Sequence, residues 1–279
     1  MGLVGLYLSA LRNDDALSVA KEAFRLAPRQ PPVLIALTRA QTAAGRLEAA
    51  TNTARSLIAL TPKRPSAHVQ LALLLAKADN LDGATQAAQT ALTLDPRDYS
   101  AILVLGRLAL RQGDRENALA RANSLGSLNP ERPEGAVLEG DVQYQAGSQR
   151  KALMAYRRAQ TIRPSTLHVI RIARTLQALG RKTDARAELT SWLDQHPEDN
   201  AIRQILAMEE HQAGDAQAAT ARYEALLERG TRSIVALNNL AWIYAQQDPR
   251  RALALAEEAR ALAPDHPSVL DTLGWMYHL

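Results

Sequence analysis

The chain has 279 residues, with 33 Lys and Arg, 29 Asp and Glu, and a formal net charge of +4. This balance does not indicate a nucleic-acid-binding or membrane-surface domain. The absence of Cys excludes disulfides, thiolate metal sites and Cys nucleophiles, and a low aromatic content of 4% favours helix throughout.

The N-terminal residues 1–11 are apolar, but they lack the basic region and the cleavage site of a signal peptide. They are also too short to cross a bilayer, and no other apolar run approaches the roughly 18 residues that a membrane-spanning helix needs. We therefore expect a soluble chain without a membrane span.

Prolines recur along the chain at a nearly constant spacing. Five of them lie 34 residues apart, and the series continues near the same period: Pro28, Pro62, Pro96, Pro130, Pro164, Pro197 and Pro264. Each interval holds two amphipathic segments separated by a turn, which predicts a pair of helices. Five of the seven turn positions hold Gly, which suits a left-handed exit from a helix: Gly45, Asp79, Gly113, Gly147, Gly180, Gly214 and Gln247.

Small residues recur in the second helix of each pair. Five residues after every turn there is an Ala: Ala50, Ala84, Ala118, Ala152, Ala185, Ala219 and Ala252. A small side chain at this place allows the second helix to approach its neighbours closely.

These features together resemble the tetratricopeptide repeat, which has a 34-residue period, a Leu-Gly or Leu-Ala pair in its first helix and an Ala-x3-Tyr-x2-Ala motif in its second. The motif is present at Ala152, Tyr156 and Ala159. The resemblance covers the whole chain and implies an all-α, right-handed α-solenoid of tandem helix–turn–helix repeats with about 17 helices.

We expect one solenoid over residues 1–279. Its repeats fall at approximately 1–30, 31–64, 65–98, 99–132, 133–165, 166–199, 200–233 and 234–266, followed by a lone helix at 267–279. Because the chain stops halfway through a repeat, we expect it to be a fragment of a longer protein. Gly230-Thr231 replaces Pro at the sixth boundary, so this junction should be the least regular.

The sequence offers no motif for catalysis or metal binding. Gly135 and Gly140 have the spacing of a phosphate loop, but Asp141 stands where Lys is required. The cluster at 209–211 cannot converge on one ion, because adjacent residues of a helix point in different directions. We therefore predict a non-enzymatic protein without a cofactor and assign no catalytic or metal-binding residue.

By resemblance, partners bind in a groove lined by the first helices of successive repeats. The residues expected to face it are Arg39, Arg107, Asp141, Tyr144, Arg174, Asn238, Trp242 and Trp275. The arginines, over an aliphatic floor, suit an extended peptide with apolar and acidic side chains. Asn238 and the two Trp residues offer an aromatic–amide surface of the hot-spot type. The alternatives are that the arginines are solvated and that the Trp side chains pack between helices.

Between Val142 and Thr183 the chain carries nine Lys and Arg but no Asp or Glu. Most fall on second helices or their turns, hence on the convex side. We define the basic convex patch as Arg150, Lys151, Arg157 and Arg158. It is either a solvated face or a docking surface for an acidic protein, an anionic polysaccharide or lipid headgroups. Nucleic acid is less well supported, because few aromatic residues lie between the cations.

The C-terminal run Ala236–Trp275 resembles the last repeats of the exosortase/PEP-CTERM-associated tetratricopeptide lipoproteins of bacteria. That resemblance implies a periplasmic, outer-membrane-tethered scaffold linked with exopolysaccharide production and protein sorting. Two alternatives remain. One is a cytoplasmic regulatory module that binds an acidic partner or nucleic acid through the basic convex patch, and the other is a helper domain of an enzyme.

The expected partners are proteins or peptides. Self-association is a further possibility, because Trp275, Met276 and Leu279 should leave an exposed apolar patch on the lone last helix.

Overall fold

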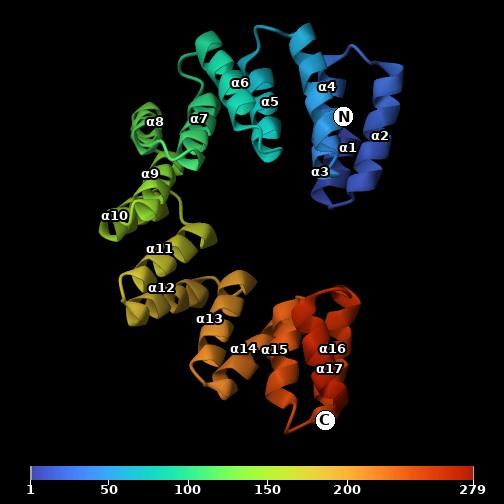
Figure 1. Ribbon diagram of the computed structural model, residues 1–279, viewed down its shortest axis with the longest axis vertical. Helices are drawn as coiled ribbons and strands as arrows, with labels where there is room; N and C mark the ends of the chain where they lie inside the picture. The colour runs from blue at the N-terminus through green and yellow to red at the C-terminus, as the bar shows by residue number, and fades with distance from the viewer. Residues whose placement is uncertain (1, 279) are drawn as a thin grey trace. The chain divides into compact units, whose positions relative to one another are not determined.

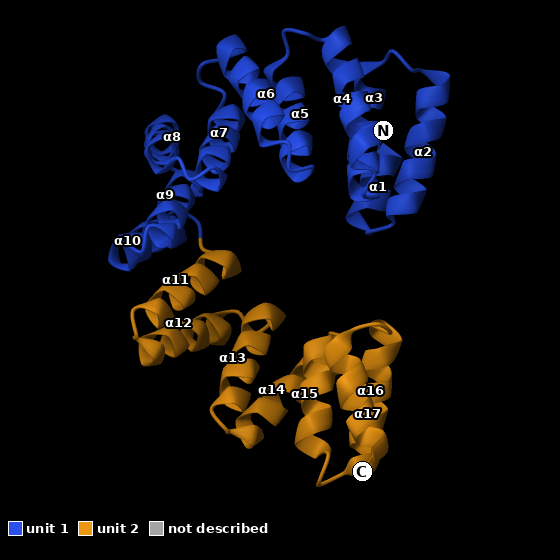
Figure 2. Cartoon of the chain, viewed as in Figure 1, with its two compact units in different colours: residues 1–163 blue, residues 164–279 orange. Residues whose placement is uncertain are grey.

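The computed structural model describes residues 2–278, which form 17 α-helices and no strand (Figure 1). The prediction of an all-α chain with about 17 helices is thereby confirmed. We call the odd-numbered helices A helices and the even-numbered ones B helices, so that each A helix and the following B helix form one pair. The chain divides into two compact units, unit 1 (residues 1–163) and unit 2 (residues 164–279) (Figure 2). The expectation of one continuous solenoid stays a prediction.

Unit 1 contains ten helices, in which A and B helices alternate along the chain. They are α1 (Gly2–Ser9), α2 (Asn13–Leu26), α3 (Pro31–Ala43), α4 (Leu47–Leu60), α5 (Pro65–Lys77), α6 (Leu81–Leu94), α7 (Tyr99–Arg111), α8 (Arg115–Leu128), α9 (Glu134–Gln145) and α10 (Gln149–Ile162).

Unit 2 contains seven helices. They are α11 (Thr166–Ala178), α12 (Lys182–Gln195), α13 (Asn200–Gln212), α14 (Ala216–Glu228), α15 (Ile234–Tyr244), α16 (Pro249–Leu262) and α17 (Pro267–His278).

Six of the seven predicted A–B turns use a left-handed backbone conformation, and the exception is the turn at Gln247 between α15 and α16. Asp79 takes this conformation without being a Gly, with φ of 62°. Arg111 of α7 compensates, because its Nη2 donates to the Asp79 carboxylate at 2.7 Å and its Nη1 donates to the carbonyl of Ala76 at 2.8 Å. A side chain from the next pair thus holds a turn that Gly would otherwise adopt freely.

Small residues fix the distance between the helices of a pair. The recurrent Ala of the B helices is fully buried in all seven pairs where it was predicted, with 0% exposure: Ala50, Ala84, Ala118, Ala152, Ala185, Ala219 and Ala252. In the A helices, Gly140 has the same role. A Cβ atom added to it would lie 2.4 Å from Cε1 of Tyr156 in α10. The helix α10 therefore rests directly on the backbone of α9.

Two buried tyrosines tie B helices to A helices. The hydroxyl of Tyr156 donates to Oδ1 of Asp141 at 2.8 Å, and Nδ2 of Asn239 donates to the hydroxyl of Tyr223 at 2.7 Å. Tyr156 is 3% exposed and Tyr223 0%, and burial raises the pKa of Tyr223. Each ring fills space beside an A helix while its polar end is satisfied.

Asp199 joins three helices of unit 2. It precedes α13 and accepts hydrogen bonds from the backbone N–H of Ile202 at 3.1 Å, from Oγ1 of Thr166 at 2.6 Å and from Nε1 of Trp192 at 2.8 Å. Burial alone would raise the pKa of Asp199, but these hydrogen bonds outweigh burial and hold it below its usual value. The charged carboxylate is therefore the form that stabilises unit 2.

Replacing Gly140 by Ala should destabilise unit 1 by about 1–3 kcal/mol, because the new methyl group would overlap the hydrogen-bonded Tyr156 ring. Gly126→Ala in α8 is the control, since its added Cβ meets nothing within 4 Å. The control should be neutral or stabilising by up to about 1 kcal/mol, because Ala favours helix over Gly. Urea unfolding followed by circular dichroism measures both changes. Equal effects of the two substitutions would contradict the close approach of α9 and α10.

Asp199→Asn should lower the stability of unit 2 at pH 7 by about 1–2 kcal/mol. Because the folded-state pKa of Asp199 is depressed, the wild-type advantage is present above the unfolded-state pKa of about 3.9. It should disappear as the pH falls below that value. Unfolding at pH 7 and at about pH 2.5 tests this, with the exposed Asp194→Asn of α12 as the control. A loss of equal size at both pH values would show that the charge is not responsible.

Candidate functional site

Contacts between A helices are interrupted at one place in unit 2. Within unit 1, α1 contacts α3, α5 contacts α7 and α7 contacts α9, and within unit 2 α11 contacts α13 and α15 contacts α17. The helices α13 and α15 have few or no close backbone contacts within the described residues, and the same holds for α3 and α5 of unit 1. Space is therefore left between α13 and α15.

The irregular junction predicted from the sequence lies beside this space. The helix α14 has 13 residues, whereas each other B helix has 14. It ends at Glu228, and Gly230 follows two residues later with φ of 74° and donates its N–H to the carbonyl of Leu227 at 2.9 Å. The following helix α15 has only 11 residues. A shorter B helix and a Gly in place of Pro change the entry of α15 and separate it from α13.

A cleft of about 420 Å³ lies at this junction, and we call it the unit 2 cleft. It is lined by three A helices and the turn before α17: Met208, His211, Gln212, Ile234, Val235, Asn238, Asn239, His266, Ser268 and Val269. None of these residues is Lys, Arg, Asp or Glu. The lining therefore combines aliphatic surface with neutral hydrogen-bonding groups.

Two adjacent asparagines of α15 have opposite environments. Asn239 is satisfied by its hydrogen bond to Tyr223. The Oδ1 atom of Asn238 is buried and accepts no hydrogen bond within the described part of the chain. A buried acceptor without a donor costs about 1–3 kcal/mol, which a ligand N–H group recovers where the Asn238 side chain turns its oxygen into the cleft. Asn238 was predicted from the sequence to face partners, and it lines the cleft.

The predicted Trp residues lie on the same A helices. Trp242 and Trp275 are 40% and 45% exposed, and their rings stack with centroids 6.0 Å apart and an interplanar angle of 21°. They are thus both packed against each other and open to solvent. We call this pair the indole pair.

The other predicted groove residues lie on A helices of one unit or the other. Arg174 is exposed on α11 in unit 2, and Arg39 and Arg107 are exposed on α3 and α7 in unit 1. On α9, Asp141 and Tyr144 are half-buried, and Asp141 accepts the hydrogen bond from Tyr156 described above. The partner-binding role of these five residues stays a prediction.

The prediction of an exposed apolar patch on the last helix is wrong for Met276. Met276 is only 7% exposed and packs with Leu273, Ala241 and Ala256. It lies three residues after Leu273 and so shares the face of α17 that meets α15 and α16. Leu279 lies outside the described residues, and self-association stays a prediction.

The basic convex patch lies on α10, and part of its charge is used within unit 1. Nη2 of Arg158 donates to Glu139 of α9 at 2.5 Å, and Arg157 also has an interaction partner. Arg150 and Lys151 are exposed in the first turn of the helix. The absence of acidic residues from this stretch of sequence therefore overstated the free charge on the surface.

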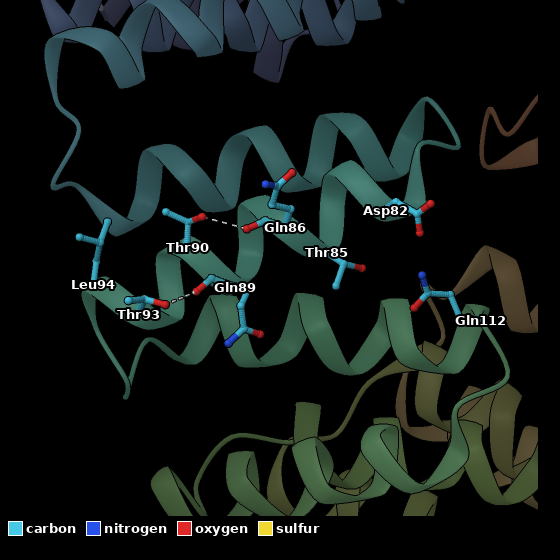
Figure 3. Close-up of a pocket in the computed structure, with 8 residues that line it drawn as sticks. All are labelled: Asp82, Thr85, Gln86, Gln89, Thr90, Thr93, Leu94 and Gln112. Atoms are coloured by element: carbon cyan, nitrogen blue, oxygen red, sulfur yellow. Dashed lines mark hydrogen bonds between the residues drawn. The ribbon is translucent and has the colours of Figure 1, made fainter.

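A second, larger hollow of about 550 Å³ follows the surface of α6 in unit 1 (Figure 3). Its hydroxyl groups are satisfied within their own helix. Thr90 donates to the carbonyl of Gln86 and Thr93 to that of Gln89 (Figure 3), and Thr85 donates to the carbonyl of Leu81. Because these groups need no outside partner, the unit 2 cleft is the better candidate site.

Neither a metal centre nor a membrane span is found in the described residues. Within 2–278, no three or more His, Cys, Asp or Glu side chains are grouped so that they could hold a metal ion. In the same range, no helix combines the length and the hydrophobicity needed to cross a bilayer.

Comparison with known proteins identifies the repeat. Two tetratricopeptide repeat models match residues 7–78 and 103–165. The chain contains tetratricopeptide repeats. Proteins built from these repeats are generally non-enzymatic scaffolds for protein–protein interaction, which agrees with the class of function predicted from the sequence. No curated protein matches the sequence.

Solved structures show the same tetratricopeptide solenoid fold. A chain of the APC/C hetero-tetramer Cut9–Hcn1 has 13% identity and a TM-score of 0.55, with coverage of 98% of this chain and 54% of that one. A tetratricopeptide repeat protein from Parabacteroides merdae has 17% identity and a TM-score of 0.57, with coverage of 88% and 98%. A thermophilic tetratricopeptide repeat protein from Thermus thermophilus has 23% identity and a TM-score of 0.55, with coverage of 64% of this chain and 96% of that one. The chain spans about half the length of the first of these relatives, and at these identities the likeness shows the fold alone.

Several residues of the unit 2 cleft were not among the sequence-based candidates. Asn239 and Gln212 line it beside predicted positions, and His266 and Ser268 reach it from the turn and first residues of α17. Only the missing Pro at Gly230-Thr231 pointed to this junction in the sequence. It showed where the repeat is irregular, but not which side chains the irregularity would expose.

We expect substitutions of the two asparagines to have opposite effects on the stability of the fold. Asn238→Ala should leave the stability unchanged or raise it by up to about 1 kcal/mol, since it removes an unpaired buried acceptor and adds a good helix former. Asn239→Ala should lower it by about 1–3 kcal/mol, because the buried Tyr223 hydroxyl loses its donor. Thermal unfolding of both variants provides the measurement. A destabilised Asn238→Ala variant would mean that this side chain is structural.

Proposed function

We propose that this chain is a protein-interaction scaffold in which unit 2 binds an extended peptide segment of a partner protein in the unit 2 cleft. The observation that carries the proposal is the buried Oδ1 atom of Asn238, which lines the cleft and has no donor in the described residues. An extended peptide presents a backbone N–H group at regular intervals and can supply that donor.

The lining of the cleft supports a particular kind of segment. Met208, Ile234 and Val235 offer aliphatic surface, and Gln212 and Ser268 offer neutral donors and acceptors for a peptide backbone. The volume of about 420 Å³ lies within the range of about 300–1,000 Å³ that is usual for ligand pockets. Because the lining carries no fixed charge, a charged side chain buried here would lose its hydration without gaining a partner. The segment that fits has an aliphatic side chain at this point.

Peptide display on the intact chain tests the proposal. Selected peptides should share an uncharged aliphatic residue, and Asn238→Ala should weaken their binding by about tenfold, which corresponds to about 1.4 kcal/mol. Met208→Glu should weaken binding further, because it places a charge in the apolar part of the cleft. Fluorescence anisotropy with a labelled selected peptide gives the affinities.

Crosslinking then locates the peptide. A photoreactive phenylalanine analogue at Val235, which is 37% exposed on α15, should capture the peptide. The same analogue at the exposed Gln217 on α14 is the control. Capture at Gln217 alone, or binding unaffected by both substitutions in the cleft, would show that partners use another surface.

The cellular setting is a separate proposal. We propose a bacterial envelope system for exopolysaccharide production or protein sorting, and its support is the sequence resemblance of Ala236–Trp275. Cell fractionation of the native protein tests it, since recovery in the cytoplasm would contradict an envelope location. The alternative, a cytoplasmic module that binds an acidic partner or nucleic acid through the basic convex patch, stays a prediction.

A further inference from the structure

We infer that the indole pair and Asp271 form a subsite for a cationic side chain, Arg or Lys, of the partner segment. This inference rests on the proposed function of unit 2 as a peptide site and specifies the chemistry of the peptide beyond the cleft. It stands on three independent observations: the rigid aromatic surface, the absence of an internal cation over it, and an unpaired carboxylate beside it.

The aromatic surface is held in place by buried hydrogen bonds. Nε1 of Trp242 donates to Oγ1 of Thr272 at 2.8 Å, and that hydroxyl donates to the carbonyl of Ser268 at 2.8 Å. Thr272 is 1% exposed. The plane of Trp242 is therefore fixed to α17, and Trp275 stacks on it. A surface fixed in advance binds a ligand without the entropic cost of ordering two large side chains.

Three half-buried tyrosines elsewhere in the chain are covered by arginines. The guanidinium carbons of Arg12, Arg132 and Arg251 lie 4.7, 3.8 and 4.3 Å from the ring centroids of Tyr7, Tyr99 and Tyr244. Within residues 2–278 no such cation covers Trp242 or Trp275. Trp is the best cation–π partner among the aromatic side chains, so its uncovered face is a favourable place for a cation from another molecule.

Asp271 gives this surface its charge preference. It lies on α17 four residues before Trp275, so the two side chains are neighbours on one helix face. Asp271 is exposed and forms no ion pair with another described residue. A cation placed against the indole pair would gain this carboxylate as a second partner. A sugar ring or a proline would gain stacking but no charge pairing.

The subsite is within reach of a peptide held in the cleft. Asn238 and Trp242 are four residues apart on α15, which corresponds to about one helical turn, or roughly 5.4 Å. An extended chain advances about 3.3 Å per residue, so two residues cover this distance. The segment that fits carries an aliphatic side chain in the cleft and an Arg or Lys two or three residues away.

Paired peptides test the inference by nuclear magnetic resonance. The probes are acetylated, amidated peptides Val-Ala-Arg and Val-Ala-Ala-Arg, their reversed orders, and the same peptides with neutral citrulline in place of Arg. The readout is the indole N–H signals, which Trp→Phe variants assign. We expect the Arg peptides to shift the signals of Trp242 and Trp275 but not Trp192. Their affinity should exceed that of the citrulline peptides by about threefold to tenfold.

Matched variants separate charge from general surface effects. Asp271→Asn should abolish most of the preference for Arg, whereas Asp265→Asn, an exposed acid in the turn before α17, should preserve it. Equal affinities for the Arg and citrulline peptides, or a preference that survives Asp271→Asn, would overturn the inference. The inference would also be overturned if no peptide shifted the indole signals, or if maltose or a neutral Pro-containing peptide shifted them equally.

The two proposals fail in different ways. If both kinds of peptide bind equally and Asn238→Ala weakens them, the cationic subsite is wrong and the peptide cleft stands. If Asn238→Ala has no effect but acetyl-Arg-amide still shifts the indole signals with dependence on Asp271, the cleft is wrong and the subsite stands by itself.

Discussion

The close approach of neighbouring helices across small side chains is the constraint on which this structure depends. Ala is fully buried at the same place in seven B helices, and Gly140 leaves no room for a methyl group against Tyr156. Where backbones come this close, a helix pair has a fixed geometry that each repeat reproduces. That geometry buries one face of every A helix and leaves another in solvent, where residues such as Arg107 and Trp242 are exposed.

The candidate site occurs where this regularity is interrupted. One residue fewer in α14 and Gly230 in place of a closing Pro separate α15 from α13, and the cleft lies in the space between them. The interruption also decides the environments of two neighbouring asparagines. Both line the cleft, but the amide of Asn239 donates to Tyr223, whereas Asn238 has a buried oxygen without a donor in the described residues. An unpaired buried acceptor lowers the stability of the free chain, and in our proposal a bound partner removes that free-energy cost.

Part of the charge in this chain is used internally. Arg158 pairs with Glu139, and in unit 2 the buried Glu210 accepts from both Arg186 at 2.8 Å and Arg222 at 2.8 Å. A count of basic residues along the sequence therefore says little about the charge that a partner meets. The candidate site in unit 2 is a cleft without Lys, Arg, Asp or Glu beside an aromatic surface and the carboxylate of Asp271. Such a combination selects a partner by the order of its apolar and cationic side chains rather than by net charge.

The sequence by itself determined the all-α repeat architecture, the helix pairs and the irregular junction. These follow from local features, namely turn residues, Pro positions and the period of small side chains, and each acts within one repeat. It also placed Asn238, Trp242 and Trp275 on exposed faces of A helices. Only the tertiary structure decided that α13 and α15 part to form a cleft, that the two indoles stack and that Met276 is buried. The physical reason is that these properties depend on distances between helices that belong to different repeats. Small changes in helix length and packing set those distances, and no residue encodes them alone.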